Sequence, residues 1–407
     1  MVPTLPAQSE QVVPPGTLNS GSSVYCVQSI LGQGAYGIVV KCVKIKDMTT
    51  VAVKMIKQRP CFLKLANIEV AALSRLKSLC VDKCNLVKWH RVFMDKGHVC
   101  LEFEHLDKSL YEFLKERDRC SLLLKEIRPI IQQLANALNH LKLAGIIHAD
   151  LKLENVMLVS HEKEPYRVKV IDFGMACKDS EAKVGSYIQS RPYRAPEIIL
   201  GLPFTVAIDM WSLGCLAAAL YLGTQLYPGK TEYDMMRFIV ETRGQPADHL
   251  LSHGRKTSRF FQRDNSSTPS LWKLKSPQQF YTETGIRPMK NKHFRVTRLD
   301  DLIHTQAVHC DNAADKVAQM SDALMFVDML KEMLHLDATK RATPGQVLQH
   351  KYITMQHLIS MIPHSNHVVS CFHIMDRFQD KKDARPSLQK NSPRSNIPVE
   401  LTAMYRK

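Results

Sequence analysis

The fold is decided by His148-Ala149-Asp150-Leu151-Lys152-Leu153-Glu154-Asn155, followed after a short apolar strand by Asp172-Phe173-Gly174. In this pattern the first aspartate is placed to accept a hydroxyl proton. The asparagine and the second aspartate are spaced to hold Mg²⁺ through hard oxygen atoms. We therefore expect a phosphoryl-transfer enzyme in which Asp150 is the base and Lys152 steadies the transferred group. Asn155 and Asp172 are the expected metal ligands.

A glycine-rich stretch lies upstream: Gly32-Gln33-Gly34-Ala35-Tyr36-Gly37-Ile38-Val39. Glycines let the backbone approach phosphate oxygens because no Cβ stands in the way. Dinucleotide-binding folds share this spacing, but they need a helix directly after the glycines. Here the chain continues as Val40-Lys41-Cys42-Val43, which is typical of a strand. The pattern therefore favours a hairpin covering phosphates, with Gly32, Gly34 and Gly37 in the nucleotide site.

A lysine follows on the third predicted strand, in Val51-Ala52-Val53-Lys54. A lysine with apolar neighbours often only reaches past them to the surface. After a glycine hairpin, however, it fits a role in clamping the nucleotide phosphates. Such a lysine needs a carboxylate to hold it, and Glu69 lies in the middle of the next predicted helix. An ion pair between strand and helix also provides a switch, because moving the helix breaks it.

Between Asp172 and Arg194-Ala195-Pro196-Glu197 lies a segment with several hydroxyls, including Tyr187 and Ser190. A hydroxyl beside arginines can be phosphorylated and then hold a loop in place. For any one serine, a plain loop hydroxyl remains the simpler interpretation. Glu197 has a plausible ion-pair partner in Arg341, which would be a structural contact in the larger lobe.

Composition limits the class of protein. The chain has 407 residues, of which 45% are hydrophobic and 23% charged, as in ordinary globular proteins. The net charge of +16 favours acidic partners, although a solvated basic surface with basic tails is the simpler explanation. No zinc-finger, RRM-type or helix-turn-helix pattern occurs, so we do not expect direct nucleic-acid binding.

Eleven cysteines at irregular spacing, without a signal peptide, predict reduced thiols in the cytoplasm or the nucleus. Cys80, Cys84, His90, His98 and Cys100 match no familiar zinc finger, so we interpret them as ordinary structural residues. The most apolar run, residues 213–222, is too short to span a bilayer. We expect no membrane partner.

The order of predicted elements indicates two lobes in an α+β arrangement. Strands are expected at 25–30, 38–44, 50–56, 85–93 and 98–103, and helices at 62–79, 110–114, 127–143, 209–222, 321–334 and 343–349. The small lobe (24–104) is then mainly antiparallel sheet with one helix, and the large lobe (105–354) mainly helical. Outside this pattern we predict a flexible leader (1–23), a polar surface insertion (about 254–317) and a basic C-terminal tail (355–407).

Together these motifs resemble those of eukaryotic protein kinases, over about residues 24–354. The match narrows with His148-Ala149-Asp150, which has alanine where most kinases have arginine, and with Tyr187-Ile188-Gln189-Ser190-Arg191 and Ala207-Ile208-Asp209-Met210-Trp211. Arg259-Phe260-Phe261-Gln262-Arg263-Asp264 and Pro363-His364-Ser365-Asn366-His367-Val368 add to it. These stretches are similar to the homeodomain-interacting protein kinases, in the group that includes the cyclin-dependent and MAP kinases.

The resemblance implies a serine/threonine kinase of the nucleus or cytoplasm that uses ATP and Mg²⁺. It implies protein substrates such as transcription factors and co-regulators, often modified at Ser or Thr before Pro, and we expect a monomer. Tyr187 would be autophosphorylated, with Arg191 and Arg194 as phosphate partners. The resemblance also places in the nucleotide site, besides the residues above, Val39, Ala52, Phe103 at the back of the adenine pocket, and the hinge residues Glu104 to Leu106.

Three residues depart from the family pattern. Leu153 stands where relatives have proline, Pro192 replaces a tyrosine, and Glu102 interrupts an apolar strand. None removes a reactive group, so an active enzyme is our expectation, while Pro192 puts the peptide preference in doubt. The alternative is a nucleotide-binding scaffold that has lost turnover. Since only a short tail follows the kinase-like region, homeodomain binding is not carried over.

Overall fold

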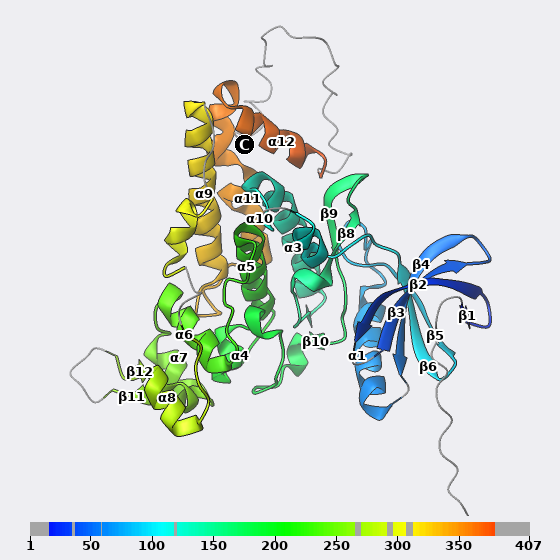
Figure 1. Cartoon of the computed structure of the whole chain (residues 1–407), viewed down its shortest axis with the longest axis horizontal. Helices are drawn as coiled ribbons and strands as arrows, with labels where there is room; N and C mark the ends of the chain where they lie inside the picture. Colours follow the sequence, from blue (N-terminus) through cyan, green and yellow to red (C-terminus); the bar gives the residue numbers. More distant parts are fainter. Residues whose placement is uncertain are drawn as a thin grey trace, which may run out of the picture.

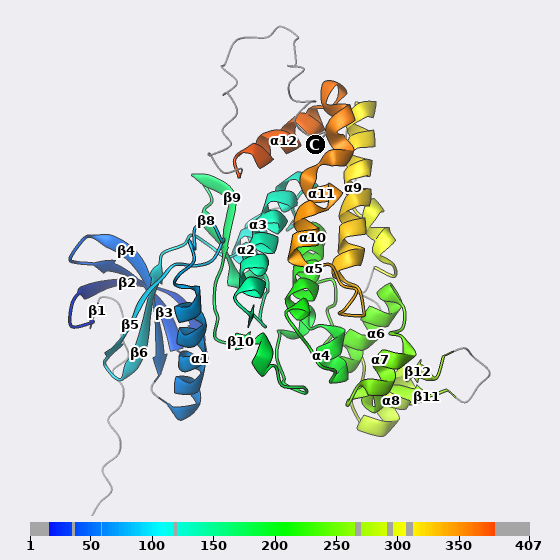
Figure 2. The same cartoon turned by 180° about the vertical axis from the view of Figure 1, so that it is seen from behind.

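The computed structural model describes residues 16–34, 37–57, 59–117, 120–264, 270–290, 296–306 and 312–378. Within them the chain forms two lobes, a sheet with one helix at one end and a mainly helical body at the other (Figures 1 and 2). The expected α+β two-lobe fold is confirmed. None of the helices in these ranges has the length and apolar character needed to cross a membrane.

The small lobe is built on a six-stranded sheet in which every neighbouring pair is antiparallel. In spatial order the strands are β1 (Gly16–Asn19), β2 (Val24–Gly34), β3 (Gly37–Lys44), β4 (Thr49–Lys57), β6 (His98–Glu104) and β5 (Trp89–Asp95). Side chains alternate between the two faces: Val51, Val53 and Met55 of β4 are buried, and Ala52 and Lys54 between them are half-buried. Lys54 therefore lies on the opposite face of the sheet from the buried Val51, Val53 and Met55.

Helix α1 (Pro60–Leu76) is the helix of the small lobe and contacts β4. It starts with proline in its first turn, where a missing N–H costs nothing. Its buried residues recur at helical spacing: Ala66, Glu69, Ala72, Leu73 and Leu76. Glu69 is therefore the single charged group on the buried face of α1.

The charge that interrupts β6 has a structural explanation. Glu102 is 1% exposed, and its carboxylate accepts a hydrogen bond from the Tyr25 hydroxyl at 2.7 Å. Arg91 and Lys44 lie 3.0 and 3.3 Å from the same carboxylate. A buried carboxylate with three such partners links β2, β3, β5 and β6 instead of disrupting them.

Packed helices form most of the large lobe. The central helix α5 (Ala207–Leu222) is buried over almost its whole length and contacts α3 (Leu124–Leu143) and α9 (Ala313–Met333). The other helices are α2 (Leu110–Lys115), α4 (Pro196–Leu200), α6 (Glu232–Arg243), α7 (Asp248–His253), α8 (Pro277–Thr284), α10 (Pro344–Gln349), α11 (Lys351–Thr354) and α12 (Asn366–Asp376). The short strands are β7 (Ile146–Ile147), β8 (Val156–Ser160), β9 (Glu164–Val170), β10 (Cys177–Lys178), β11 (Phe261–Arg263) and β12 (Trp272–Leu274).

The ion pair expected between Arg341 and Glu197 is confirmed. Two guanidinium nitrogens of Arg341 donate to the two carboxylate oxygens of Glu197, at 2.7 and 2.9 Å. Arg341 also donates to the backbone carbonyls of Ala207 (2.8 Å) and His335 (3.0 Å). The pair thus ties α4 and α5 to the loop that precedes α10.

Three boundary predictions need correction. The leader (1–23) is wrong for its last part, because β1 pairs with β2 through Gly16–Asn19; residues 1–15 lie outside the described ranges. The segment 254–317 is more than a polar surface insertion. It contains the β11–β12 hairpin, α8 and the start of α9, and it buries Phe260, Phe261, Phe280, Leu299 and Leu302. These few apolar anchors are too widely spaced to produce a periodic signal.

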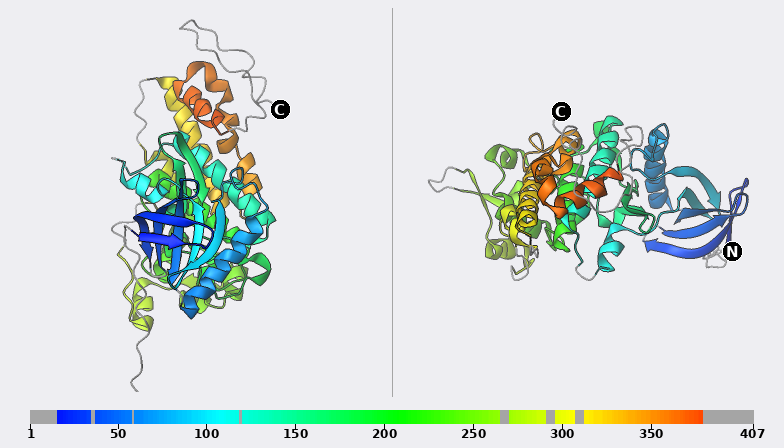
Figure 3. Two further views of the ribbon diagram at one scale, coloured as in Figure 1. Left: turned by 90° about the vertical axis from the view of Figure 1, so that its right-hand side faces the viewer. Right: turned by 90° about the horizontal axis from the view of Figure 1, so that it is seen from above.

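The tail (355–407) is likewise wrong up to residue 378. A 3₁₀ segment, Gln356–His364, leads into α12, which lies beside α9 at the end of the large lobe (Figures 1 and 3). Residues 379–407 lie outside the described ranges.

Candidate active site

The loop that carries Asp150 is held by a buried aspartate of α5. Asp209, 2% exposed, accepts hydrogen bonds from the backbone N–H groups of His148 (2.7 Å) and Ala149 (3.0 Å). Ala149 has φ of 63°, a left-handed conformation that is costly for a residue with a Cβ. The two bonds to Asp209 hold the loop in this conformation. Since both donors are backbone groups, this anchoring does not depend on the side chain at position 149.

His148 has the structural position expected from the sequence. It is fully buried, its Nε2 lies 3.0 Å from the carbonyl oxygen of Ile171, and its ring meets Phe173 edge-on at 5.1 Å. The N–H of Ile171 donates to the carbonyl of Asn155 at 3.0 Å. These contacts fix the segment leading into Asp172 against the Asp150 loop.

Asp150 lies at the centre of a small polar cluster. Lys152 Nζ donates to one carboxylate oxygen at 2.7 Å, and the Ser190 hydroxyl donates to the other, also at 2.7 Å. Lys152 Nζ lies 3.2 Å from the same hydroxyl. Asn155 Nδ2 donates to the backbone carbonyl of Asp150 at 2.9 Å and to its carboxylate at 3.1 Å. A carboxylate is therefore placed against an alcohol, with a cation beside both.

Lys54 forms a second cluster with Glu69 and Asp172. Its Nζ lies 2.8 Å from a carboxylate oxygen of each. Burial alone would lower the pKa of Lys54, but the two carboxylates outweigh it and raise that pKa. Burial would raise the pKa of Asp172, and the attraction of Lys54 outweighs it and lowers that pKa. Lys54 is therefore charged and Asp172 ionised, as phosphate and metal binding require.

The residues expected to hold Mg²⁺ fit that ion by their chemistry. Asn155 donates to Asp150 through its side-chain nitrogen, Nδ2. Its side-chain oxygen takes no part in these two bonds. Asp172 directs Oδ1 to Lys54 and to the N–H of Gly174 (3.4 Å), so its second oxygen takes no part in these bonds. An amide oxygen and a carboxylate oxygen are hard ligands of the kind that Mg²⁺ prefers.

The glycines of the hairpin have different reasons to be glycine. A Cβ on Gly37 would lie 1.8 Å from the carbonyl oxygen of Met55, so close packing on β4 excludes any side chain. Among the described residues, no atom beyond the immediate chain neighbours lies within 4 Å of a Cβ added at Gly32 or Gly34. The backbone there is free of steric cover, as a phosphate-binding turn requires. Ala35 and Tyr36 lie outside the described residues.

The remaining nucleotide-site residues line up across the sheet. Ala52 on β4 is paired with Phe103 on β6, and Val39 on β3 is paired with Lys54. Phe103 and Leu106 are buried. The carboxylate of Glu104 lies 2.7 Å from Lys169 Nζ on β9, so this side chain has a structural contact.

The arginines near Tyr187 are not equivalent. Tyr187 is 63% exposed, and its ring lies 3.9 Å from the Arg194 guanidinium. Hydrogen bonds from Arg194 and, to a smaller extent, from Arg191 lower the pKa of Tyr187. Arg194 is buried and already donates to the carbonyls of Ile188 and Gln189 and to Glu232. Arg191 has a buried Nε with no hydrogen-bond partner among the described residues. Arg191 is thus the better placed of the two for a new anionic partner.

The residues that depart from the family pattern fit their local structure. Leu153 starts a 3₁₀ turn, Leu153–Asn155, and its side chain is 6% exposed within the main hydrophobic core. Pro192 lies in the first turn of another, Arg191–Tyr193, where proline is tolerated. Neither residue displaces the polar groups around Asp150.

Two functional contacts were not anticipated from the sequence. Ser190 was interpreted as a loop hydroxyl, and nothing in its spacing predicts its contact with Asp150, 40 residues away. In the sequence, Asp209 stands out only as part of a stretch that resembles the family. An acidic residue inside a nearly all-apolar helix is the signal that could have singled it out, because a buried carboxylate needs specific partners.

Comparison with known proteins gives a consistent picture. The protein kinase domain family matches residues 25–353. The chain is 48% identical over 366 residues to homeodomain-interacting protein kinase 1 of Rattus norvegicus, covering 90% of this chain and 30% of that protein. It is 42% identical over 342 residues to homeodomain-interacting protein kinase 1 of Caenorhabditis elegans, covering 82% and 40%. The chain thus spans well under half the length of these relatives.

Proposed function

The chain belongs to the protein kinase family and, within it, to the homeodomain-interacting protein kinases, and we propose that it transfers the terminal phosphate of ATP to serine or threonine hydroxyls of proteins. The observation that carries this proposal is the hydroxyl of Ser190 at 2.7 Å from the Asp150 carboxylate. It marks the position at which Asp150 can hold an alcohol and accept its proton.

In the proposed mechanism Asp150 orients the substrate hydroxyl and removes its proton. Lys152, which contacts both the carboxylate and the Ser190 hydroxyl, neutralises charge that develops on the transferred group. Lys54, held by Glu69, binds the nucleotide phosphates. Asn155 and Asp172 would hold Mg²⁺, which when bound neutralises phosphate charge and aligns the terminal phosphate.

We extend the proposal to regulation and substrates. Phosphate on Tyr187 would be held by Arg191, whose Nε has no partner within the described residues, and would order the segment beside Ser190. The relatives are named for interaction with homeodomains, which supports transcription regulators as one class of substrate. Modification of Ser or Thr before Pro, in the nucleus or cytoplasm, is part of the same proposal.

Phosphate transfer from labelled ATP to a Ser-Pro peptide tests the enzymatic proposal. The full chain with Mg²⁺ should label the peptide, and Asp150→Asn should lower the rate by about 10²–10⁴-fold. Asp47→Asn, in an exposed turn, is the matched control and should leave the rate unchanged. Transfer that is equally fast in the Asp150 variant would contradict the mechanism.

The alternative is a nucleotide-binding scaffold, motivated by Leu153 and Pro192. It predicts ATP binding by the wild-type chain without phosphate transfer, also after prior phosphorylation of Tyr187. Measuring nucleotide binding beside the transfer assay separates the two. Bound ATP without labelled peptide favours the scaffold, and labelled peptide excludes it.

A further inference from the structure

Three side chains outside the candidate active site bring together nitrogen, sulfur and oxygen ligand atoms. Asp322 comes from α9, and His367 and Cys371 come from α12; one ligand atom of each lies within 4.8 Å of the others. Asp322 and Cys371 are fully buried. His367 and Cys371 are four residues apart, so they share one face of α12. This group is unrelated to the cysteines and histidines that the sequence spacing had brought forward.

The distances from His367 to the other two side chains match those between ligand atoms of a tetrahedral metal site. His367 Nε2 lies 3.5 Å from Cys371 Sγ and 3.6 Å from Asp322 Oδ2. In a tetrahedral zinc site, bonds of about 2.0 Å to nitrogen or oxygen and about 2.3 Å to sulfur place ligand atoms about 3.3–3.5 Å apart. His367 is thus at a suitable distance from each of the other two ligand atoms to share one ion with them.

The carboxylate of Asp322 is prepared for such a role. Its Oδ1 accepts a hydrogen bond from Arg128 Nη2, and His357 Nε2 lies 3.0 Å from the same oxygen. Its Oδ2 is fully buried and has no hydrogen-bond partner among the described residues. Outer partners on one oxygen and a free second oxygen are typical of a carboxylate that binds a metal through one atom.

We propose that Asp322, His367 and Cys371 bind a zinc ion that fastens α12 to the large lobe. Nitrogen, thiolate and carboxylate ligands in one small set favour Zn²⁺ over Mg²⁺ or Ca²⁺, which prefer oxygen alone. Coordination requires a neutral imidazole and a thiolate, so binding of the ion releases the thiol proton of Cys371 and any proton on His367.

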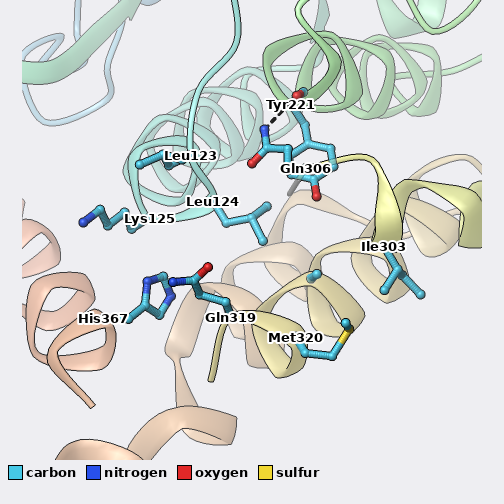
Figure 4. A pocket seen from close by; sticks show the side chains of 10 residues that line it. Leu123, Leu124, Lys125, Tyr221, Ile303, Gln306, Gln319, Met320 and His367 are labelled. Carbon is cyan, nitrogen blue, oxygen red and sulfur yellow. Dashed lines mark hydrogen bonds between the residues drawn. The ribbon is translucent and has the colours of Figure 1, made fainter. Parts of the chain in front are cut away.

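Access and room for a fourth ligand come from a neighbouring pocket of about 130 Å³. His367 lines it together with Gln319 and Lys125, and Figure 4 shows the His367 ring beside the Gln319 side chain. A water molecule can complete the coordination from this side. The first turn of α12 is already held in place, since the N–H of His367 donates to Asp315 at 3.1 Å.

Metal content of the full chain tests this inference. After chelation and titration with ZnCl₂, the wild-type chain should retain close to one Zn²⁺. Cys371→Ser and His367→Gln should weaken binding at least about tenfold, whereas His373→Gln, an exposed histidine on the same helix, should retain it. Unchanged affinity in Cys371→Ser, or no stoichiometric zinc in the wild type, would overturn the proposal.

Zinc X-ray absorption on the wild-type chain decides the matter even if the variants do not fold. One sulfur neighbour at about 2.3 Å is the expected result. The exposed group of Asp328, Glu332 and His350 also brings three ligand atoms together, but it has no sulfur. A spectrum with only nitrogen and oxygen neighbours therefore overturns the proposed site.

Discussion

Two groups of ion pairs in this molecule use the same chemistry for different ends. In the candidate active site, Lys54 (23% exposed) meets Glu69 and Asp172, whose side chains are 2% and 39% exposed. In the large lobe, Arg341 meets Glu197 with side-chain exposures of 0% and 4%. The first group joins a strand, a helix and a loop from two lobes. The second joins elements within one lobe.

The difference indicates which pair holds the fold and which serves chemistry. Removing one partner of a buried pair leaves an uncompensated charge, whereas partly exposed pairs contribute little to stability. The Lys54 contacts also depend on the position of α1, so they can be broken by movement of that helix. We therefore expect stability to depend on Arg341 and turnover to depend on Lys54.

The largest expected effect is on stability. Arg341→Met leaves Glu197 buried without its partner and should lower the free energy of unfolding by about 3–5 kcal/mol, measured by urea denaturation. The double variant Arg341→Met/Glu197→Leu should recover part of the loss, since no charge is then left unpaired. A loss below about 1 kcal/mol in the single variant would contradict the structural role.

Lys54→Met should have the opposite signature. Loss of a cation from the phosphate site should lower the rate of peptide phosphorylation by about 10²–10³-fold. The free energy of unfolding should fall by less than about 2 kcal/mol, because burial raises the pKa of Glu69, which can take up a proton instead of remaining charged. Lys57→Met, at the exposed end of the same strand, is the control. Destabilisation of Lys54→Met as large as that of Arg341→Met would remove the distinction.

A smaller effect is expected at Tyr187. Tyr187→Phe removes the hydroxyl that would carry phosphate, and with it hydrogen bonds to Arg191 worth about 1.5–3 kcal/mol. Turnover on an added peptide should fall about tenfold or more, with nucleotide affinity nearly unchanged. Tyr111→Phe, an exposed tyrosine on α2, serves as the control. Equal turnover in both variants would contradict the anchoring by Tyr187.

The sequence predicted those features that depend on local pattern. Alternating strands and helical spacing were enough to predict two lobes. The motif order also singled out Lys54, Glu69 and Asp172, which the structure brings into contact. The contacts that escaped prediction join distant segments. Ser190 contacts Asp150, which is 40 residues away in the sequence. His367, in the segment interpreted as a tail, lies close to Asp322 in α9. β1 also escaped, because its short run of four residues gives no clear alternation.

Calorimetric titration of ATP into the full chain, with and without Mg²⁺, tests most directly whether the candidate active site binds ATP together with Mg²⁺. The account predicts one ATP bound per chain, with affinity that falls when Mg²⁺ is removed and is lost to a similar extent in Asp172→Asn. No uptake of ATP in the presence of Mg²⁺, or equal affinity in the Asp172 variant, would contradict it.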